Sequence, residues 1–261
     1  MGLRPISFQF GDTINYAAGY YRAAGSDTIV VDMDAEWLFY GIMNLCKISG
    51  LSVSAWFLIV EVCYLGFVLL AFKKLIGENP WMGMLFFLSA FSTFTYGTNG
   101  IRNGMACSVA TFAFALGANK NIVKMVVPGI IAVLALGIHK SILLPTAAFV
   151  AASFVIKNPL YAIYFWIASI GISLVAGGPV SNFFMGLGFD DRMTQYAGGM
   201  DEFGDQFANT GFRWDFLLYS AMPVWLTWYV CQKAKKERAL YGDTAEEAET
   251  GVTGAGRIAD V

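Results

Sequence analysis

Cationic side chains stand at the ends of two long apolar runs in segment 99–145. Arg102 opens the first run and the pair His139-Lys140 closes the second, while the interiors of both runs carry almost no charge. A cation at membrane depth costs at least roughly 2.5 kcal/mol unless it finds a partner or a watered cavity. These residues therefore predict a functional site.

Arg102 lies in the sequence GIRNG, between glycine and asparagine residues that can break a helix and expose backbone N–H groups. Its planar guanidinium suits bidentate capture of a phosphate group. The alternative is an arginine that snorkels at the membrane interface, but its glycine and asparagine neighbours leave little apolar surface for the stem. We therefore expect Arg102 to bind phosphate.

His139 is the single histidine of the chain, and histidine is the side chain that normally titrates near neutral pH. It could act as a general base toward a hydroxyl group, or it could be a structural residue at a helix end. The sequence leaves both interpretations open. Lys140 is a candidate substrate-binding residue, with a plain interface lysine as the alternative.

Loop 179–211 and the residues after it hold a second group of polar candidates. Planar and bidentate side chains suit sugar hydroxyls, and a tyrosine adds a stacking face. A solvated acidic loop explains the same composition equally well. The loop candidates are Asp190, Asp191, Arg192 and Tyr196. Arg213 and Asp215 follow it, and they could bind substrate or neutralise each other.

The composition is that of a membrane protein. Of 261 residues, 57% are hydrophobic and 14% are charged, whereas a soluble domain carries about 25% charged residues. The net charge of −2 decides nothing about nucleic acid by itself, but no basic stripe occurs outside the run KAKKER, so we expect no nucleic-acid partner. The four cysteines form no CxxC pair or Cys/His cluster. We therefore expect no disulfide framework, no metal and no cofactor.

Seven apolar runs approach the length of about 20 residues that a helix needs to cross a bilayer. The third to fifth are short, which indicates broken or tilted helices around Arg102 and His139. We predict an all-α polytopic bundle of about seven transmembrane helices. Glu61 lies in the first run and must face the bundle interior, where we expect a structural hydrogen bond. The runs are 52–72, 81–98, 104–118, 122–137, 141–156, 160–177 and 212–231.

Three regions follow from this pattern. Residues 1–50 are predicted to form an outer-face segment in which Asp34 caps an interfacial helix. Residues 51–231 form the transmembrane domain, and the polar tail 232–261 is predicted to be disordered. The apolar face of the interfacial helix is predicted to contain Trp37, Leu38, Gly41, Ile42 and Leu45.

Loop charges orient these spans. If all seven runs cross the membrane, most lysines between them fall on one side, and excess Lys/Arg marks the cytoplasmic side. The N-terminal segment, Arg102, His139, Lys140 and loop 179–211 then share the outer face. The orienting charges are Lys73, Lys74, Lys120, Lys124, Lys157 and the cluster 233–238.

Six sequence blocks occur in a recognisable order between about residues 4 and 225. They are GDTINY, DAEWLFYGI, TNGIRNGMACSVATFAF, GIHKSILLP, DDRMTQY and TGFRWDFLLYSAMP. In that order they resemble the EpsG family, the Wzy-like polymerases of bacterial O-antigen, capsule and exopolysaccharide synthesis.

This resemblance implies a multi-pass enzyme of the bacterial inner membrane that acts at the outer leaflet. Such a polymerase joins oligosaccharide repeat units carried on undecaprenyl diphosphate by transferring the growing glycan onto the next lipid-linked unit. On this mapping Arg102 contacts the diphosphate and His139 is the base or its orienter. No metal is needed if arginines supply the positive charge. The implied glycan path is lined by Asp12, Arg192, Tyr196 and Arg213.

The implied partners are membrane lipids, a flippase and a chain-length regulator. Family members usually carry a helix before the block at residues 4–16 and further spans after 212–231, so we expect a truncated member that could be inactive. Two other functions stay open. One is another outer-face glycosyl or acyl transferase, such as an O-antigen ligase with a lipid A core acceptor. The other is a non-enzymatic polysaccharide or solute transporter, for which inverted repeats would be expected.

Overall fold

The computed structural model describes residues 1–22, 36–118, 125–155, 163–172 and 217–233, together with 161, 174, 235 and 236. All regular structure in these residues is helical, as the sequence predicts, and they contain no strand. The chain divides into two compact units, Met1–Lys157 and Asn158–Val261.

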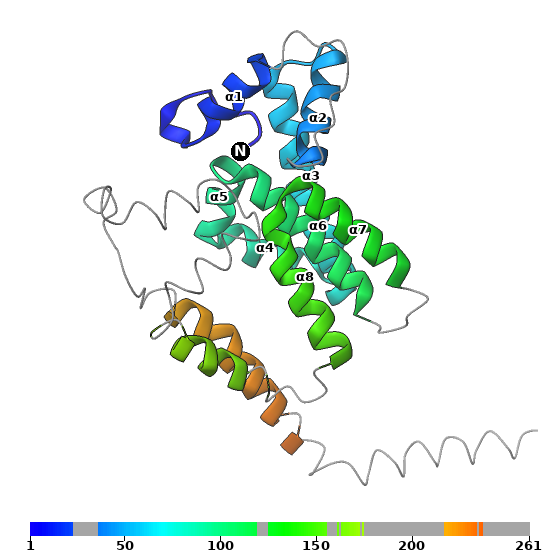
Figure 1. Cartoon of the computed structure of the whole chain (residues 1–261), viewed down its shortest axis with the longest axis vertical. Coiled ribbons are helices and arrows are strands. Elements are labelled where there is room, and N and C mark those ends of the chain that lie inside the picture. The colour runs from blue at the N-terminus through cyan, green and yellow to red at the C-terminus, as the bar shows by residue number, and fades with distance from the viewer. Residues whose placement is uncertain are drawn as a thin grey trace, which may run out of the picture. The chain divides into compact units, whose positions relative to one another are not determined.

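The first unit begins with a 3-10 turn, η1 (Phe8–Phe10), followed by helices α1 (Thr13–Arg22) and α2 (Trp37–Ile48). Figure 1 shows α1 and α2 together at one end of the helices that follow. Lys47 joins the two helices because its Nζ donates hydrogen bonds to the carbonyl oxygens of Tyr20 (2.8 Å) and Tyr21 (3.2 Å). The C-terminus of α1 is therefore fixed by a charge on α2.

Helix α2 packs on the protein core through Phe39, Met43 and Cys46, which are its buried residues. They recur at intervals of three and four residues and so share one face. This face joins the protein core, which ties α2 to the helices beneath it. Leu45, on the face predicted to lie against the bilayer, is 54% exposed, and contact of that face with a membrane stays a prediction.

Helix α3 (Val53–Ile76) is the long apolar helix of this unit. Ser52 caps its N-terminus by accepting a hydrogen bond from the backbone N–H of Ala55 at 3.2 Å. Gly77 ends it with a φ angle of 72°, which favours glycine. With 24 residues and a mean hydropathy of 2.3, α3 is long and apolar enough to cross a bilayer. This helix confirms the apolar helix predicted at 52–72.

The next predicted run, 81–98, forms two helices instead of one. Helix α4 (Pro80–Ser89) ends at Ala90, where the backbone is extended, and α5 (Phe91–Thr98) begins directly after it. The Thr93 hydroxyl donates to the carbonyl oxygen of Phe87 across this break. At about 1.5 Å per residue, neither helix alone covers the bilayer core of about 30 Å.

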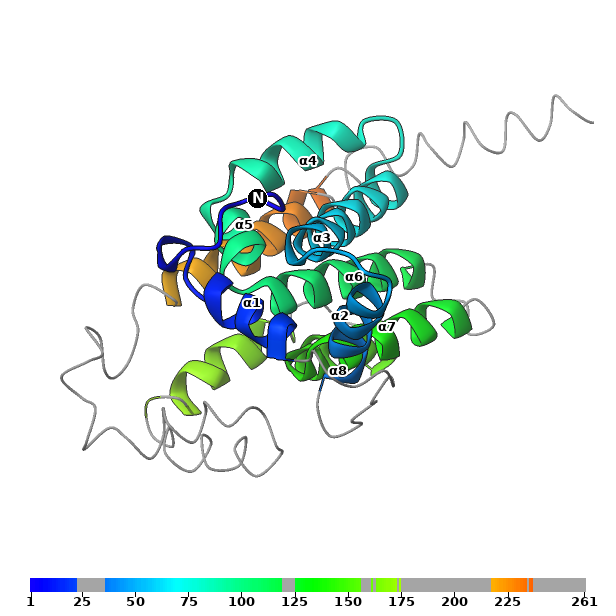
Figure 2. The same cartoon turned by 90° about the horizontal axis from the view of Figure 1, so that it is seen from above.

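Helix α6 (Ile101–Gly117) packs against α3 and against α7 (Val126–Ile138). Seen from above, α6 lies between these two helices (Figure 2). A Cβ atom added at Gly104 would lie 2.8 Å from the carbonyl oxygen of Tyr96, so this glycine permits the close approach of α5 to α6. After α7 come η3 (Lys140–Ile142), α8 (Leu143–Val150) and the π turn η4 (Ala151–Val155).

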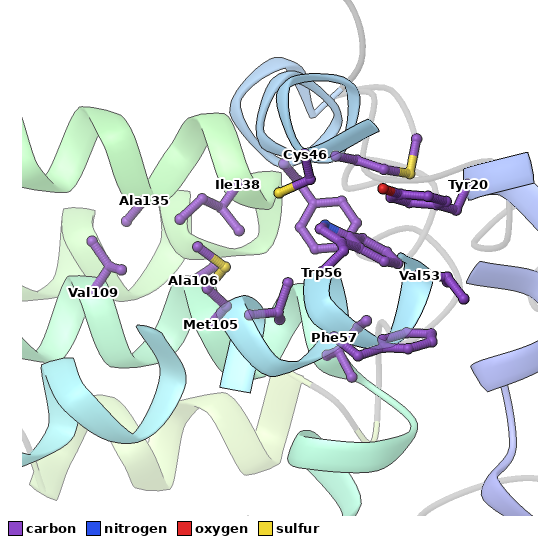
Figure 3. Close-up of a cluster of buried hydrophobic side chains, with 14 of the residues drawn as sticks. Tyr20, Cys46, Val53, Trp56, Phe57, Met105, Ala106, Val109, Ala135 and Ile138 are labelled. Carbon is purple, nitrogen blue, oxygen red and sulfur yellow. The ribbon is translucent and has the colours of Figure 1, made fainter. Parts of the chain in front are cut away.

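The core of the first unit is centred on Trp56, which is fully buried. Figure 3 shows its indole close to the rings of Tyr20 and Phe57. The centroid of the Trp56 ring lies 5.5 Å from the ring centroid of Tyr20, 5.6 Å from that of Phe39 and 4.9 Å from that of Phe57. Because these rings come from α1, α2 and α3, burial of aromatic surface holds the N-terminal helices on the end of α3.

The second unit contains a helix at Ile163–Ile172 and another at 217–233. They are joined by a hydrogen bond in which Trp166 Nε1 donates to Ser220 Oγ at 3.2 Å. On the second of these helices the rings of Trp225 and Tyr229 stack, with centroids 5.8 Å apart. Both predicted runs in this part of the chain thus contain helix.

Among the described residues, α3 is the one helix that meets the length and composition expected of a membrane span. The short third to fifth runs are short helices, since α6, α7 and α8 have 17, 13 and 8 residues. The described part of the chain is therefore helical with one clear apolar span, and the count of seven spans stays a prediction. The shorter apolar helices are Pro80–Ser89, Val126–Ile138, Lys140–Val155 and Ile163–Ile172.

Candidate functional site

Glu36 joins the two candidate catalytic residues. Its Oε2 atom lies 2.5 Å from Nη1 of Arg102, and its Oε1 atom lies 2.6 Å from Nδ1 of His139. The three side chains are 13%, 15% and 17% exposed, respectively. The structure thus brings Arg102 and His139 together through a carboxylate that the sequence analysis did not mark.

Opposite chain directions in α6 and α7 bring Arg102 and His139 to the same end of the unit. Arg102 is the second residue of α6, and His139 follows the last residue of α7. Gly100 precedes α6 as its N-cap residue, so the helix continues through Asn103 and Gly104. The expected helix break around Arg102 therefore lies before it, at Gly100.

Helix α2 supplies Glu36 as its N-cap residue, although the Glu36 side chain makes no capping bond. The predicted cap, Asp34, lies outside the described residues. The neighbouring Trp37 packs against Gly137, where an added Cβ atom would lie 2.6 Å from the indole ring. This close contact between α2 and α7 lies next to the contact between Glu36 and His139, so it fixes the position of the carboxylate.

Two tyrosines complete the surroundings of Arg102. Its Nε donates to the hydroxyl of Tyr16, and its Nη1 donates to the hydroxyl of Tyr40, both at 3.3 Å. The guanidinium also lies 5.7 Å from the centre of the Tyr16 ring, which is within range of a cation–π interaction. Nη2 of Arg102 makes no hydrogen bond with the described part of the chain. Nη2 is therefore the group of the guanidinium that keeps its hydrogen-bond donors unused within the described residues.

The environment of Glu36 keeps it ionised. Burial alone would raise the pKa of the Glu36 carboxyl, but its hydrogen bond with His139 and the charge of Arg102 lower that pKa below its usual value. An ionised carboxylate only accepts hydrogen bonds, so the proton at this contact resides on Nδ1 of His139. In the neutral ring, Nε2 then carries the lone pair that can accept a proton.

A neutral contact runs beside this charged one. Ser141 Oγ donates a hydrogen bond to Oδ1 of Asn103 at 3.2 Å. Asn103 follows Arg102 on α6, and Ser141 lies two residues beyond His139 on η3. The segments that carry the two candidate catalytic residues are thus linked twice, once through Glu36 and once directly.

The other predicted site residues are described only in part. Lys140 is exposed on η3 beside His139. Asp12 precedes α1, where its Oδ1 accepts from Nδ2 of Asn15 at 3.1 Å and its backbone N–H donates to Oδ1 of Asn99 at 2.8 Å. The predicted residues outside the described parts are Asp190, Asp191, Arg192, Tyr196, Arg213 and Asp215.

Glu61 is buried on α3, as expected, with 6% of its surface exposed. Its Oε1 atom has no hydrogen-bond partner within the described ranges, so the predicted structural hydrogen bond is not found at this atom. Both carboxylate oxygens face Gly97, where an added Cβ atom would lie 3.1 and 3.2 Å from them. The described residues contain no group of three potential metal-ligating side chains.

The residues that the sequence analysis missed are Glu36, Tyr16 and Tyr40. Each lies in one of the recognised blocks, Tyr16 in GDTINY and the other two in DAEWLFYGI. Their place within these recognised blocks is the sequence signal that could have found them. A carboxylate and two tyrosines in an amphipathic segment otherwise resemble a solvated surface.

Comparison with known proteins gives one match. No curated protein and no solved structure matches the chain, but the EpsG family model matches residues 5–242. EpsG proteins are membrane proteins associated with polysaccharide polymerase activity, which implies a lipid-linked glycan as substrate in general. Because the match covers most of the sequence, the chain belongs to the EpsG family.

Proposed function

We propose that this protein lengthens a bacterial polysaccharide at the outer leaflet of the inner membrane by joining repeat units carried on undecaprenyl diphosphate. The family assignment supports a polymerase-type activity. The observation that carries the proposal is the chain of contacts Arg102–Glu36–His139. On this proposal the chain crosses the membrane about seven times, with these residues at the outer end of the bundle.

His139 is the proposed general base. Glu36 holds Nδ1 at 2.6 Å, which fixes the ring orientation and leaves Nε2 to accept a proton. When Nε2 takes a proton from an acceptor hydroxyl, the resulting imidazolium already lies against a carboxylate. The positive charge that develops in the transition state is therefore stabilised without rearrangement.

Arg102 has two proposed roles. It holds Oε2 of Glu36, and its Nη2 group can donate to a phosphate oxygen. Since Glu36 already balances the charge of Arg102, a diphosphate needs further cations. Lys140, which directly follows His139 on η3, is the candidate within the same unit to supply one.

The proposed reaction forms one glycosidic bond and breaks one glycosyl phosphate bond. The acceptor hydroxyl oxygen attacks the anomeric carbon of the donor glycan, and its proton passes to Nε2 of His139. The bond between the anomeric carbon and the phosphate oxygen breaks, and undecaprenyl diphosphate leaves with the electron pair. The cations around the diphosphate stabilise this leaving group.

Complementation tests the proposal directly. A bacterial strain that lacks its cognate polymerase would express the wild type, Arg102→Ala, His139→Ala or the control Arg22→Ala, with membrane insertion checked for each. Arg22 is an exposed arginine at the end of α1, and its Nε donates a hydrogen bond to the local carbonyl oxygen of Ala18. Polysaccharide length would be read on a gel.

We expect a ladder of long chains from the wild type and Arg22→Ala, and a single repeat unit from the two inserted site variants. Long chains from His139→Ala would exclude His139 as the base. A single repeat unit from the wild type would contradict polymerase activity of this polypeptide. A product attached to lipid A core in the absence of longer chains would indicate a ligase instead.

A further inference from the structure

Asn103 carries hydrogen-bond donors that the described fold does not use. Its Oδ1 accepts from Ser141 Oγ at 3.2 Å, and Sγ of Cys107 lies 3.4 Å from the same oxygen. An asparagine amide also has two N–H groups on Nδ2, and neither donates to a residue that the structure describes. Because the oxygen is held by Ser141 and Cys107, the N–H groups point away from them.

The position of Asn103 places these donors beside the proposed reaction centre. Asn103 directly follows Arg102, and its partner Ser141 lies two residues after His139. The contact between Ser141 and Asn103 joins the same two chain segments that Glu36 joins. The Asn103 amide therefore lies at the junction of the two segments that carry the candidate catalytic residues.

The surface next to Asn103 is accessible. Asn103 itself is half-buried, whereas Cys107 and Thr111, one and two turns further along the same face of α6, are exposed in the described part of the chain. An amide donor that is removed from water without a partner costs about 1–3 kcal/mol. This position therefore suits a ligand that brings hydrogen-bond acceptors of its own.

The chemistry of the amide selects the kind of acceptor. An amide is neutral, and the charges of Arg102 and Glu36 balance each other. A diphosphate is bound more strongly by cationic side chains. Two neutral N–H donors in one plane match the hydroxyl, ring or acetamido oxygens of a sugar instead. The acceptor hydroxyl in the proposed reaction belongs to such a sugar.

We propose that Asn103 binds the acceptor sugar by donating hydrogen bonds to oxygen atoms next to the hydroxyl that His139 deprotonates, and that Ser141 is the positioning residue for its amide. This inference rests on the proposed function and assigns to it a residue that determines acceptor affinity. The hydroxyl of Ser141 fixes which side of the amide faces the sugar.

Two pairs of variants separate these roles. Asn103→Leu removes the amide at similar volume, and Asn103→Asp keeps an oxygen for Ser141 but replaces the N–H donors. Ser141→Ala removes the orienting hydroxyl, and Ser141→Thr retains it. Thr111→Ala is the matched control on the same exposed face, because the Thr111 hydroxyl donates only to the local carbonyl of Cys107 in the described structure.

The full-length chain would be reconstituted in liposomes with lipid-linked repeat units extracted from a host that lacks its polymerase. Both polymerisation kinetics and equilibrium binding of the radiolabelled unit would be measured. We expect Asn103→Asp and Asn103→Leu to raise the acceptor KM and the Kd about tenfold, as the loss of about 1.4 kcal/mol predicts, with kcat within about threefold. Ser141→Ala should raise the acceptor KM and the Kd by a smaller factor. Ser141→Thr, which keeps the hydroxyl, should leave both constants unchanged.

Unchanged KM and Kd in both folded Asn103 variants would overturn the inference, and so would an equal loss in Thr111→Ala. Polymer formation by the wild type together with unchanged Asn103 variants would reject only the role of Asn103. A wild type that binds the lipid-linked unit without forming polymer would reject the proposed function, while the Kd values would still decide the role of Asn103. Absence of wild-type binding would overturn both.

Discussion

Nδ1 of His139 lies 2.6 Å from Oε1 of Glu36, although 103 residues separate the two in the sequence. This contact determines which ring nitrogen is available for chemistry, because the carboxylate occupies Nδ1 and leaves Nε2 open. Arg102 holds the second carboxylate oxygen at 2.5 Å. The position of Glu36 therefore controls the geometry of both residues that the sequence marks as functional.

Glu36→Gln should lower the rate of polymer formation about 100-fold, within the range of about 10²–10⁴ typical of general-base catalysis. The amide retains the size of the side chain but cannot stabilise an imidazolium by its charge. The measurement is kcat in liposomes with lipid-linked repeat units. Glu78→Gln is the control, because Glu78 is exposed after the end of α3. Equal activity of Glu36→Gln and the wild type would exclude this role of Glu36.

The stability contributed by Glu36 should depend on pH. The pKa of its carboxyl is lower in the folded protein than its usual value, so the ionised form stabilises the fold. This contribution is complete above the unfolded pKa of about 4.3 and is lost as the pH falls through the lower, folded pKa. In detergent, the wild type should therefore unfold at a higher temperature than Glu36→Gln at pH 6–7, and the difference should shrink toward pH 3. A difference that stays constant over this range would contradict the assignment.

Gly137→Ala should impair the site through the contact between α7, which carries Gly137, and α2, which carries Trp37. The added methyl group would lie 2.6 Å from the Trp37 indole, so Trp37 and the adjacent Glu36 must move. Displacement of a positioning group by about 1 Å can cost about 100-fold in rate, and we expect a loss of at least tenfold in kcat.

Gly129→Ala is the matched control for this experiment, because Gly129 lies on the same helix with open space at its Cβ position. Replacement of Trp37 by the smaller phenylalanine in the Gly137→Ala background should restore part of the activity. Full activity of Gly137→Ala alone would show that this packing does not position Glu36.

Arg4→Gln should destabilise the fold without touching the site directly. Arg4 is buried, and its guanidinium donates to the carbonyl oxygens of Gly97 and Thr98 and to the hydroxyl of Thr13. Hydrogen bonds from charged groups contribute about 1.5–3 kcal/mol each. Loss of at least two of these bonds should therefore lower the free energy of unfolding by about 3 kcal/mol or more. Denaturant titration in detergent would measure it, with the exposed Arg22→Gln as control. Equal stability of the two variants would contradict this role.

Much of the helical architecture follows from apolar runs, because runs of this length favour helices whatever their neighbours are. The break at Ala90 is different, since it divides the apolar run 81–98 without a proline or a charge at that position. Arg102 and His139 stand out in the sequence because cations are costly at membrane depth. Glu36 does not stand out in the sequence. Its two partners follow it by 66 and 103 residues, and a local pattern of residues cannot reveal contacts over such separations.

The long separation between Glu36 and its partners also sets the order of assembly during synthesis. At about 5–20 residues per second, Arg102 is made about 3–13 s after Glu36, and His139 about 5–20 s after it. Until Arg102 has been made the Glu36 carboxylate has neither partner, and burying it alone would be costly. The carboxylate therefore has to stay in contact with water early in synthesis, and it can take its position between Arg102 and His139 only after α7 is complete.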